Sequence, residues 1–232
     1  PGWPGVPAHA HLAMIAVTLA RPFLIADLGA PHRVLSFAPW RPGFQTADRI
    51  VWREVRNADL TPDFDAESWY AAELARAGHA GAVGMLTSRD IGRHCLRHAE
   101  VEGLRVSCLA TVGLGNAERI GARLGRVLVD WGTINVAVKI EAALTDAAML
   151  EAFSLAAEAR TAAVLSVGLQ TPEGLATGTG TDCIAMAAQQ GMLAYAGKHT
   201  AIGEAVGRTV FDAVRSGASD WMAENAGRLP PG

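Results

Sequence analysis

The chain has almost no surplus of charge. Its 20 lysines and arginines nearly balance 23 aspartates and glutamates, so that the formal net charge is -3, and the arginines are scattered along the sequence. Proteins that bind nucleic acids usually carry a basic patch or stripe. The sequence therefore predicts no nucleic-acid partner.

Cysteine is also scarce. The three cysteines, Cys95, Cys108 and Cys183, form an odd set without CxxC spacing. Such a set suits a reducing compartment better than a disulfide framework. We therefore expect a cytoplasmic protein.

Long apolar runs are missing as well. No stretch reaches the length of about 18 uninterrupted apolar residues that a membrane helix needs, and Leu12 to Leu28 is broken by Thr18, Arg21, Pro22 and Asp27. This stretch is typical of strands around a turn, and we expect no membrane association.

The two ends differ in composition from the rest of the chain. The N-terminal PGWPGVP lacks the positive start and apolar core of a secretory signal, so we expect residues 1–11 to be disordered, processed or extraneous. Residues 223–232, with the sequence GRLPPG at their end, are expected to form a loose tail. With 50% hydrophobic and 19% charged residues, the remaining 12–222 fit a single globular domain.

Short strands dominate the expected secondary structure. Their positions follow from alternating apolar residues between Pro, Gly and Asp: Met14–Leu19, Phe23–Leu28, Arg33–Ala38, Arg49–Val55, Ala80–Leu86, Val106–Val112 and Arg126–Ile140. Helices are expected at Asp65–Ala77, Ile91–Glu102, Asp146–Val167 and from Ala201 to about Arg215. Strands in groups separated by single long helices favour an α+β fold, with one mixed-sheet sandwich and long helices packed on it.

Several common site motifs are absent. No HExxH or GxSxG occurs, and Gly191 with Gly197-Lys198 has the wrong spacing for a phosphate loop. The glycines at 113 and 115 are followed by Glu118 where a dinucleotide fingerprint needs Gly or Ala. The segment with His94, Cys95 and His98 could align two imidazoles one helical turn apart, but no third ligand for them is nearby in the sequence, so we predict no metal site.

The stretch from Ala176 to Gly203 is the strongest candidate site. If it is extended, Thr177, Thr179 and Thr181 share one face of a strand, while Gly178 and Gly180 leave the other face open to a ligand. Asp182 follows at once, and His199 precedes Thr200, a good N-cap for the last helix.

A further carboxylate falls on the apolar stripe of the helix Asp146–Val167. Glu158 lies on this stripe, so it must be paired, protonated or directed into a cavity, or else bond to backbone at the stripe's edge. Burial would raise its pKa. Glu158 is therefore a candidate proton donor.

Eight segments in order resemble the adenosylcobinamide amidohydrolase family: RVLSFAP, GMLTSRD, ATVGLGNA, GTINV, LTDAAMLEAF, EART, ATGTGTD and YAGKHTAIGEAVGRTVFDAV. They cover roughly Arg33 to Val214. The resemblance implies hydrolysis of the amide between the corrin propionate side chain and aminopropanol, which gives adenosylcobyric acid for cobalamin salvage. The cobalt corrinoid is then substrate, and no separate cofactor is expected. Whether the chain forms a homodimer stays open.

The reaction needs a nucleophile, an oxyanion site and protonation of the leaving amine. We expect His199 to act as general base, oriented by Asp182, with water, Thr179 or Thr181 as nucleophile. Glu158 would protonate the amine. Asn135 and the backbone around Gly178 to Gly180 would form the oxyanion site. Further substrate contacts are expected from these residues: Thr177, Gly178, Gly180, Thr133, Asn135, Asn116, Thr200 and Ser36.

Two departures from the expected family pattern matter. PWRPGF at Pro39 to Phe44 replaces a more glycine-rich loop, and Arg160 stands where a lysine is expected. A guanidinium cannot donate a proton at neutral pH, so Arg160 can bind but not act as an acid. Two alternatives remain: a corrinoid-binding protein without hydrolytic activity, and an amidase acting on complete cobalamin or another large amide.

Overall fold

One large mixed sheet organises the molecule. The computed structural model describes residues 14–55, 65–122 and 132–227. The strand order is β4-β3-β2-β12-β8-β6-β5, and β1 pairs with β2 outside this path. The strands of this sheet are β1 (Ala16–Ala20), β2 (Phe23–Ser36), β3 (Gly43–Glu54), β4 (Val83–Thr87), β5 (His94–Val101), β6 (Leu104–Val112), β8 (Ile134–Leu144) and β12 (Cys183–Gln190).

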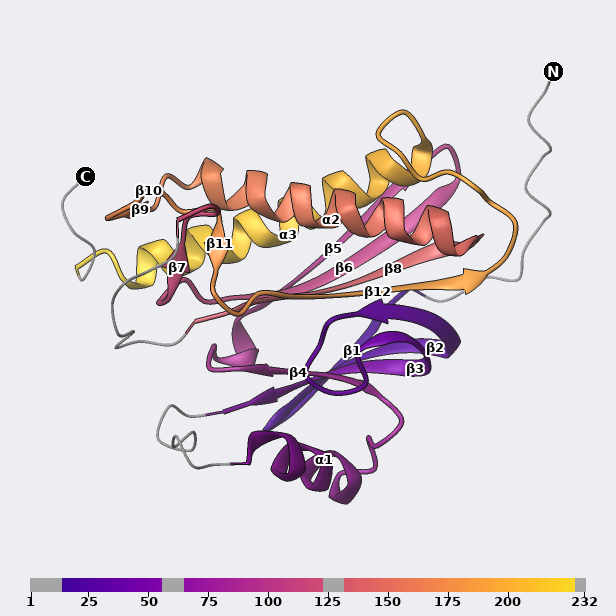
Figure 1. The fold of residues 1–232 in the computed structure, drawn as a ribbon, viewed down its shortest axis with the longest axis horizontal. Coiled ribbons are helices and arrows are strands. Elements are labelled where there is room, and N and C mark those ends of the chain that lie inside the picture. The colour runs from indigo at the N-terminus through magenta and orange to yellow at the C-terminus, as the bar shows by residue number, and fades with distance from the viewer. Residues whose placement is uncertain (1–13, 56–64, 123–131, 228–232) are drawn as a thin grey trace.

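Two long helices cover one face of the sheet (Figure 1). They are α2 (Asp146–Ser166) and α3 (Ala201–Glu224), each begun by a threonine whose hydroxyl accepts a backbone N–H. Their apolar sides pack on alternate residues of β6 and β8, such as Val112, Val136 and Val138. This layer contains the larger hydrophobic core.

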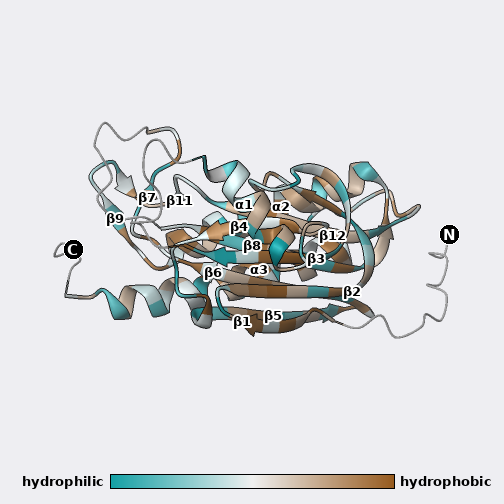
Figure 2. Cartoon of the chain, turned by 90° about the horizontal axis from the view of Figure 1, so that it is seen from below, coloured by the Kyte–Doolittle hydropathy of each residue, from teal (hydrophilic) through white to brown (hydrophobic). Residues whose placement is uncertain are grey.

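The opposite face of the central strands is covered by the N-terminal part of the chain. Leu24 and Trp52, from β2 and β3, share a second core with Leu109, Ala137 and Ala185 of β6, β8 and β12. Figure 1 shows β1 to β4 beneath β12, and Figure 2 shows hydrophobic residues concentrated along the central strands. The helix α1 (Ala66–Arg76) packs outside this layer through Tyr70 and Leu74.

Strand direction brings several segments to one edge of the sheet. β8 and β12 are parallel and are joined through α2, while β6 runs antiparallel to β8. The beginnings of β8 and β12 therefore lie beside the end of β6. Two short ladders lie outside the large sheet: β7 (Ala117–Glu118) pairs with β11 (Gly178–Thr179), and β9 (Gln170–Thr171) pairs with β10 (Gly174–Leu175).

The α+β class and the mixed sheet with long helices are confirmed. The helix expected at Ile91–Glu102 is wrong, because only Ile91–Arg93 forms a 3-10 turn, η2, and His94–Val101 is β5. The two strands expected at Phe23–Leu28 and Arg33–Ala38 are one strand, β2, with an irregularity between Asp27 and His32.

The other helix and strand boundaries lie closer to those expected from the sequence. The last helix reaches Glu224 and so enters the expected tail 223–232, of which 228–232 lie outside the described residues. The expected N-terminal segment, 1–11, also lies outside the described residues. The same holds for residues 126–131, the first part of the strand expected at Arg126–Ile140. In the described part of the chain, no helix is both long and apolar enough to span a bilayer.

Candidate active site

A cavity of about 330 Å³ lies at the edge where β8 and β12 begin. Its wall combines apolar side chains with hydroxyl, amide and thiol groups. The lining residues are Pro39, Val55, Leu86, Thr87, Ser88, Gly132, Thr133, Asn135, Thr181 and Cys183. Four of the segments by which the chain resembles the amidohydrolase family thus meet here: RVLSFAP, GMLTSRD, GTINV and ATGTGTD.

Three of the expected substrate-site residues hold the cavity wall together. Thr133 Oγ1 lies 2.8 Å from the Thr181 carbonyl oxygen and 3.0 Å from Asn135 Oδ1, both of which can accept its proton. Asn135 Nδ2 donates to the Leu86 carbonyl at 2.8 Å. Thr133 and Asn135 are buried, and these bonds connect the start of β8 with β4 and with the segment before β12.

Asn116 holds the same cavity wall through Thr181. It is fully buried and donates from Nδ2 to Thr181 Oγ1 at 3.3 Å. Thr181 Oγ1 donates in turn to the Gly132 carbonyl at 2.9 Å. A side chain on Gly132 would put its Cβ 2.6 Å from the Gly113 carbonyl oxygen, so the position needs glycine. ATVGLGNA therefore also contributes to the site, through Asn116.

Asp182 anchors the ATGTGTD segment instead of facing the cavity. Its carboxylate accepts from the backbone N–H groups of Ile134 and Thr179 at 3.1 and 3.0 Å, and from the Thr179 hydroxyl at 2.5 Å. Arg160 Nη1 of α2 lies 2.9 Å from it. The side chain is only 6% exposed, and burial raises the pKa of Asp182, opposed by Arg160 and these hydrogen bonds.

The expected arrangement of threonines and glycines is wrong. Only Gly178–Thr179 is a strand, and the three hydroxyls have different partners: Thr177 accepts from Ile120 N, Thr179 bonds Asp182, and Thr181 bonds Gly132. Gly178 leaves no open face, because a Cβ there would lie 2.4 Å from Asp182 Oδ2. Gly180 is similarly close to Glu118 Oε1, at 2.6 Å.

The expected pairing of Asp182 with His199 is also wrong. Asp182 precedes β12 and His199 follows it, and eight residues of strand span about 26 Å. The segment before His199 stays at the far end, where Leu193 pairs with Leu144 and Ala196 N donates to Glu151. Within the described residues, His199 is exposed and makes no hydrogen bond or ion pair.

Glu158 does not face the core. Its side chain is 58% exposed, lies 2.5 Å from Lys198 Nζ and lines a separate cavity between α2 and α3. Thr200 has its expected capping role, since its hydroxyl accepts from Gly203 N at 3.0 Å. Its hydroxyl also donates to the Gly197 carbonyl at 2.8 Å. The Thr200 hydroxyl is therefore engaged in bonds at the start of α3.

Ser36 and Cys183 meet beside the cavity. The Ser36 hydroxyl donates to the Ile184 carbonyl at 2.8 Å and lies 3.9 Å from Cys183 Sγ. Burial raises the pKa of Cys183 to about 12, so the thiol is neutral at pH 7. Sequence analysis missed Cys183, Thr87 and Ser88 as lining residues, although the last two lie in GMLTSRD, a segment of the family resemblance. Among the described residues, no group of three or more His, Cys, Asp or Glu side chains could hold a metal ion.

Comparisons with known proteins give one family. No curated protein matches the chain. One similar solved structure, the PH0078 protein from Pyrococcus horikoshii OT3, is 10% identical, covers 84% of this chain and 76% of its own, and has a TM-score of 0.40. The family model for adenosylcobinamide amidohydrolase matches residues 9–226. The chain therefore belongs to the adenosylcobinamide amidohydrolase family.

Proposed function

We propose that this amidohydrolase cleaves the amide between the corrin propionate side chain and aminopropanol in adenosylcobinamide, giving adenosylcobyric acid in corrinoid salvage. The family match over residues 9–226 supports the reaction class. The observation that carries the location is the meeting of four family-like segments in the cavity at the start of β8 and β12. The cobalt then reaches the protein inside its substrate.

The reaction adds water to an amide. The water oxygen bonds to the carbonyl carbon, the carbon–nitrogen bond breaks, and a proton passes to the leaving amine. Polar groups that contact the amide must be held in place before the substrate arrives. Thr133 and Asn135 are held in this way by Thr181 and Leu86.

Thr181 is the residue of this set that we place against the scissile amide. Of the two threonines expected as nucleophiles, Thr181 lines the cavity, whereas the Thr179 hydroxyl is bonded to Asp182. The Thr181 hydroxyl, which donates to the Gly132 carbonyl in the free protein, would orient the attacking water or attack the carbonyl itself. In the second case its proton passes to the leaving amine, an ester forms as the carbon–nitrogen bond breaks, and water then hydrolyses the ester. Asp182 acts as a positioning residue, because it binds the backbone of Thr179, just before this threonine, and the backbone of Ile134 at the start of β8.

Turnover of adenosylcobinamide by the purified protein tests the proposal. Mass spectrometry should find adenosylcobyric acid with wild type. Thr181→Val, which keeps the shape but removes the hydroxyl, should lower kcat/KM at least about 100-fold, the usual cost of one catalytic hydrogen bond. Thr46→Val is the matched control, since Thr46 is exposed on β3 and pairs with Arg33, toward the far end of β12.

Three results would contradict the proposal in different ways. Equal activity of Thr181→Val and Thr46→Val would move the reaction away from this cavity. A shifted corrinoid absorbance without product would favour a binding protein without hydrolytic activity. Product from complete cobalamin or another large amide, but none from adenosylcobinamide, would favour an amidase of different specificity.

A further inference from the structure

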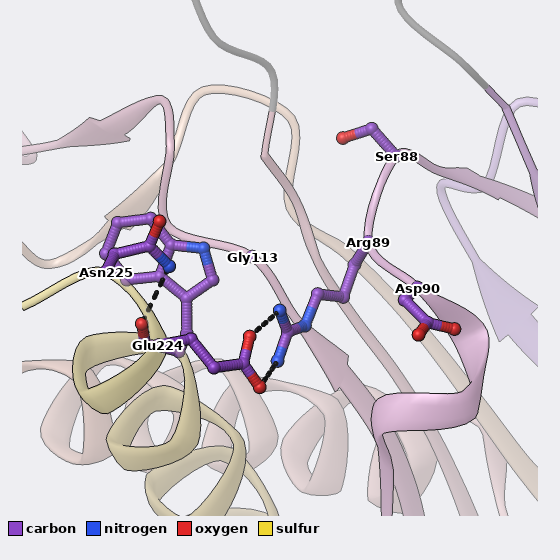
Figure 3. Close-up of a pocket in the computed structure, with 7 residues that line it drawn as sticks. Ser88, Arg89, Asp90, Gly113, Glu224 and Asn225 are labelled. Carbon is purple, nitrogen blue, oxygen red and sulfur yellow. Dashed lines mark hydrogen bonds and ion pairs between the residues drawn. The ribbon is translucent and has the colours of Figure 1, made fainter. Parts of the chain in front are cut away.

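A second cavity, of about 340 Å³, adjoins the first. It lies between the loop that follows β4 and the end of α3 (Figure 3). Its lining residues are Ser88, Arg89, Asp90, Gly113, Trp221, Glu224 and Asn225. Ser88 lines both cavities, and the position of a Cβ on Gly113 would be 3.6 Å from Thr133 N, in the wall of the first. The two cavities therefore form neighbouring parts of one surface.

An ion pair forms one side of the second cavity. Arg89 Nη1 and Nη2 donate to the two carboxylate oxygens of Glu224 at 2.5 and 3.0 Å, as Figure 3 shows. The Arg89 side chain is only 10% exposed, and its Nε is buried without a hydrogen-bond partner. This bidentate pair fixes the end of α3 against the β4 loop. The cavity is thus built by the fold and does not depend on a loose helix end.

The other side presents an aromatic ring and hydrogen-bond acceptors. The indole of Trp221 lines the cavity, and Asn225 Nδ2 donates to the Trp221 carbonyl at 2.8 Å. This bond uses one N–H of the Asn225 amino group and leaves Oδ1 as an acceptor. The carboxylates of Asp90 and Glu224 add acceptor oxygens, and both are paired with arginines: Asp90 with Arg21, and Glu224 with Arg89 and Arg93. A flat ligand that carries hydrogen-bond donors fits this lining.

We infer that the second cavity is a nucleoside subsite, which holds the 5′-deoxyadenosyl group of the substrate while the first cavity holds the amide. This inference rests on the proposed function. The adenine ring would stack on Trp221, its amino group would donate to Asn225 Oδ1, and the ribose hydroxyls would donate to Asp90 or Glu224. Trp221 and Asn225 would then make the enzyme prefer adenosylated corrinoids.

The deciding quantity is the ratio of kcat/KM for adenosylcobinamide to that for cyanocobinamide, which lacks the nucleoside. Base stacking on an aromatic side chain is worth about 5- to 150-fold in affinity. We expect Trp221→Ala to lower this ratio at least about fivefold, and Trp221→Phe to lower it less. Tyr195→Ala is the matched control, because Tyr195 is 72% exposed and lies in the segment between β12 and α3.

If Trp221→Ala leaves this kcat/KM ratio unchanged, the nucleoside subsite is overturned. The proposed amidase function would still stand. Circular dichroism and thermal unfolding establish that each variant is folded. If wild type cleaves neither corrinoid, the proposed function fails and equilibrium dialysis with labelled 5′-deoxyadenosine decides the subsite alone. Retention by wild type that is reduced in Trp221→Ala would support the subsite, and no retention by wild type would overturn it.

Discussion

The carboxylate of Asp182 occupies the space beside Gly178 that a side chain would need. A Cβ at residue 178 would lie 2.4 Å from Asp182 Oδ2 and 3.7 Å from the guanidinium carbon of Arg160. The ATGTGTD segment thus folds back on its own last residue, and Arg160 closes the contact from α2. The glycine makes room for a buried ion pair, which in turn sets the position of Thr181.

Gly178→Ala should therefore destabilise the fold. Overpacking of a tight site typically costs about 1–3 kcal/mol, and displacement of Asp182 should also lower turnover. Urea unfolding and activity assays measure both effects. Gly207→Ala is the control, because this residue of α3 has nothing within 4 Å of its Cβ position. In a helix, that change should stabilise by about 0.4–1 kcal/mol. Equal stability of the two variants would contradict the contact described.

His199→Ala should keep wild-type turnover within about twofold. Loss of a general base typically costs about 100- to 10,000-fold, but His199 is exposed at the opposite end of β12 from the cavity. Steady-state kinetics with adenosylcobinamide checks this prediction. A loss of 100-fold or more, in a folded variant, would restore the general-base role that the sequence suggested.

Cys183 should resist alkylation in the native protein. Burial raises the pKa of this thiol to about 12, and it also raises the pKa values of Cys95 and Cys108. Because only the thiolate reacts, iodoacetamide at pH 8 should label the native chain far more slowly than the urea-unfolded chain. Intact-mass measurement over time gives both rates. Rapid labelling of native Cys183 would mean that the thiol is ionised and open to the cavity.

His32 should make stability depend on pH below neutrality. It is 1% exposed, and its pKa is lowered chiefly by burial, then by the charge of Lys139, while its bond to the Ala30 carbonyl and the charge of Glu141 act in the opposite direction. Between the lowered folded pKa and about 6.5, the unfolded state binds the proton and the folded state does not. The free energy of unfolding therefore falls as pH falls through this window.

His32→Gln should remove part of that pH dependence. Its free energy of unfolding, measured in urea at pH 7.0, 6.0 and 5.0, should decline less steeply than that of wild type. The difference is at most about 1.4 kcal/mol per pH unit for one group. Parallel curves for the two proteins would show that His32 has the same pKa in both states.

Local patterns in the sequence predicted the elements that depend on local interactions. The helix Asp146–Val167 was predicted almost to the residue, because Thr145 caps it and Gly168, with φ 71°, follows its end. The error at His94–Val101 arose because pairing with β6 outweighs the weak helical pattern there, and because the turn at Glu102 and Gly103, both with positive φ, was overlooked as a hairpin signal.

The candidate site was predicted in part. Thr133, Asn135 and Thr181 were selected from the sequence and line the cavity. Asp182 and His199 belong to one polar segment of the sequence, which suggested that they lie close together. They are far apart because β12 runs along the sheet between them, and the sequence pattern did not indicate this. The exposure of Glu158 depends similarly on where α3 lies against α2. These are tertiary relationships, which sequence periodicity does not encode.

The way β12 enters the sheet has a consequence for folding kinetics. This strand joins β8 on one side and β2 on the other, and the Ser36–Ile184 hydrogen bond connects residues 148 positions apart in the chain. Contacts of such sequence separation form slowly, because a long loop must close first. The cavity has walls from β8, β12 and the ends of β2 and β4, so it is complete only after this closure. During refolding, helical signal should therefore return before catalytic activity does.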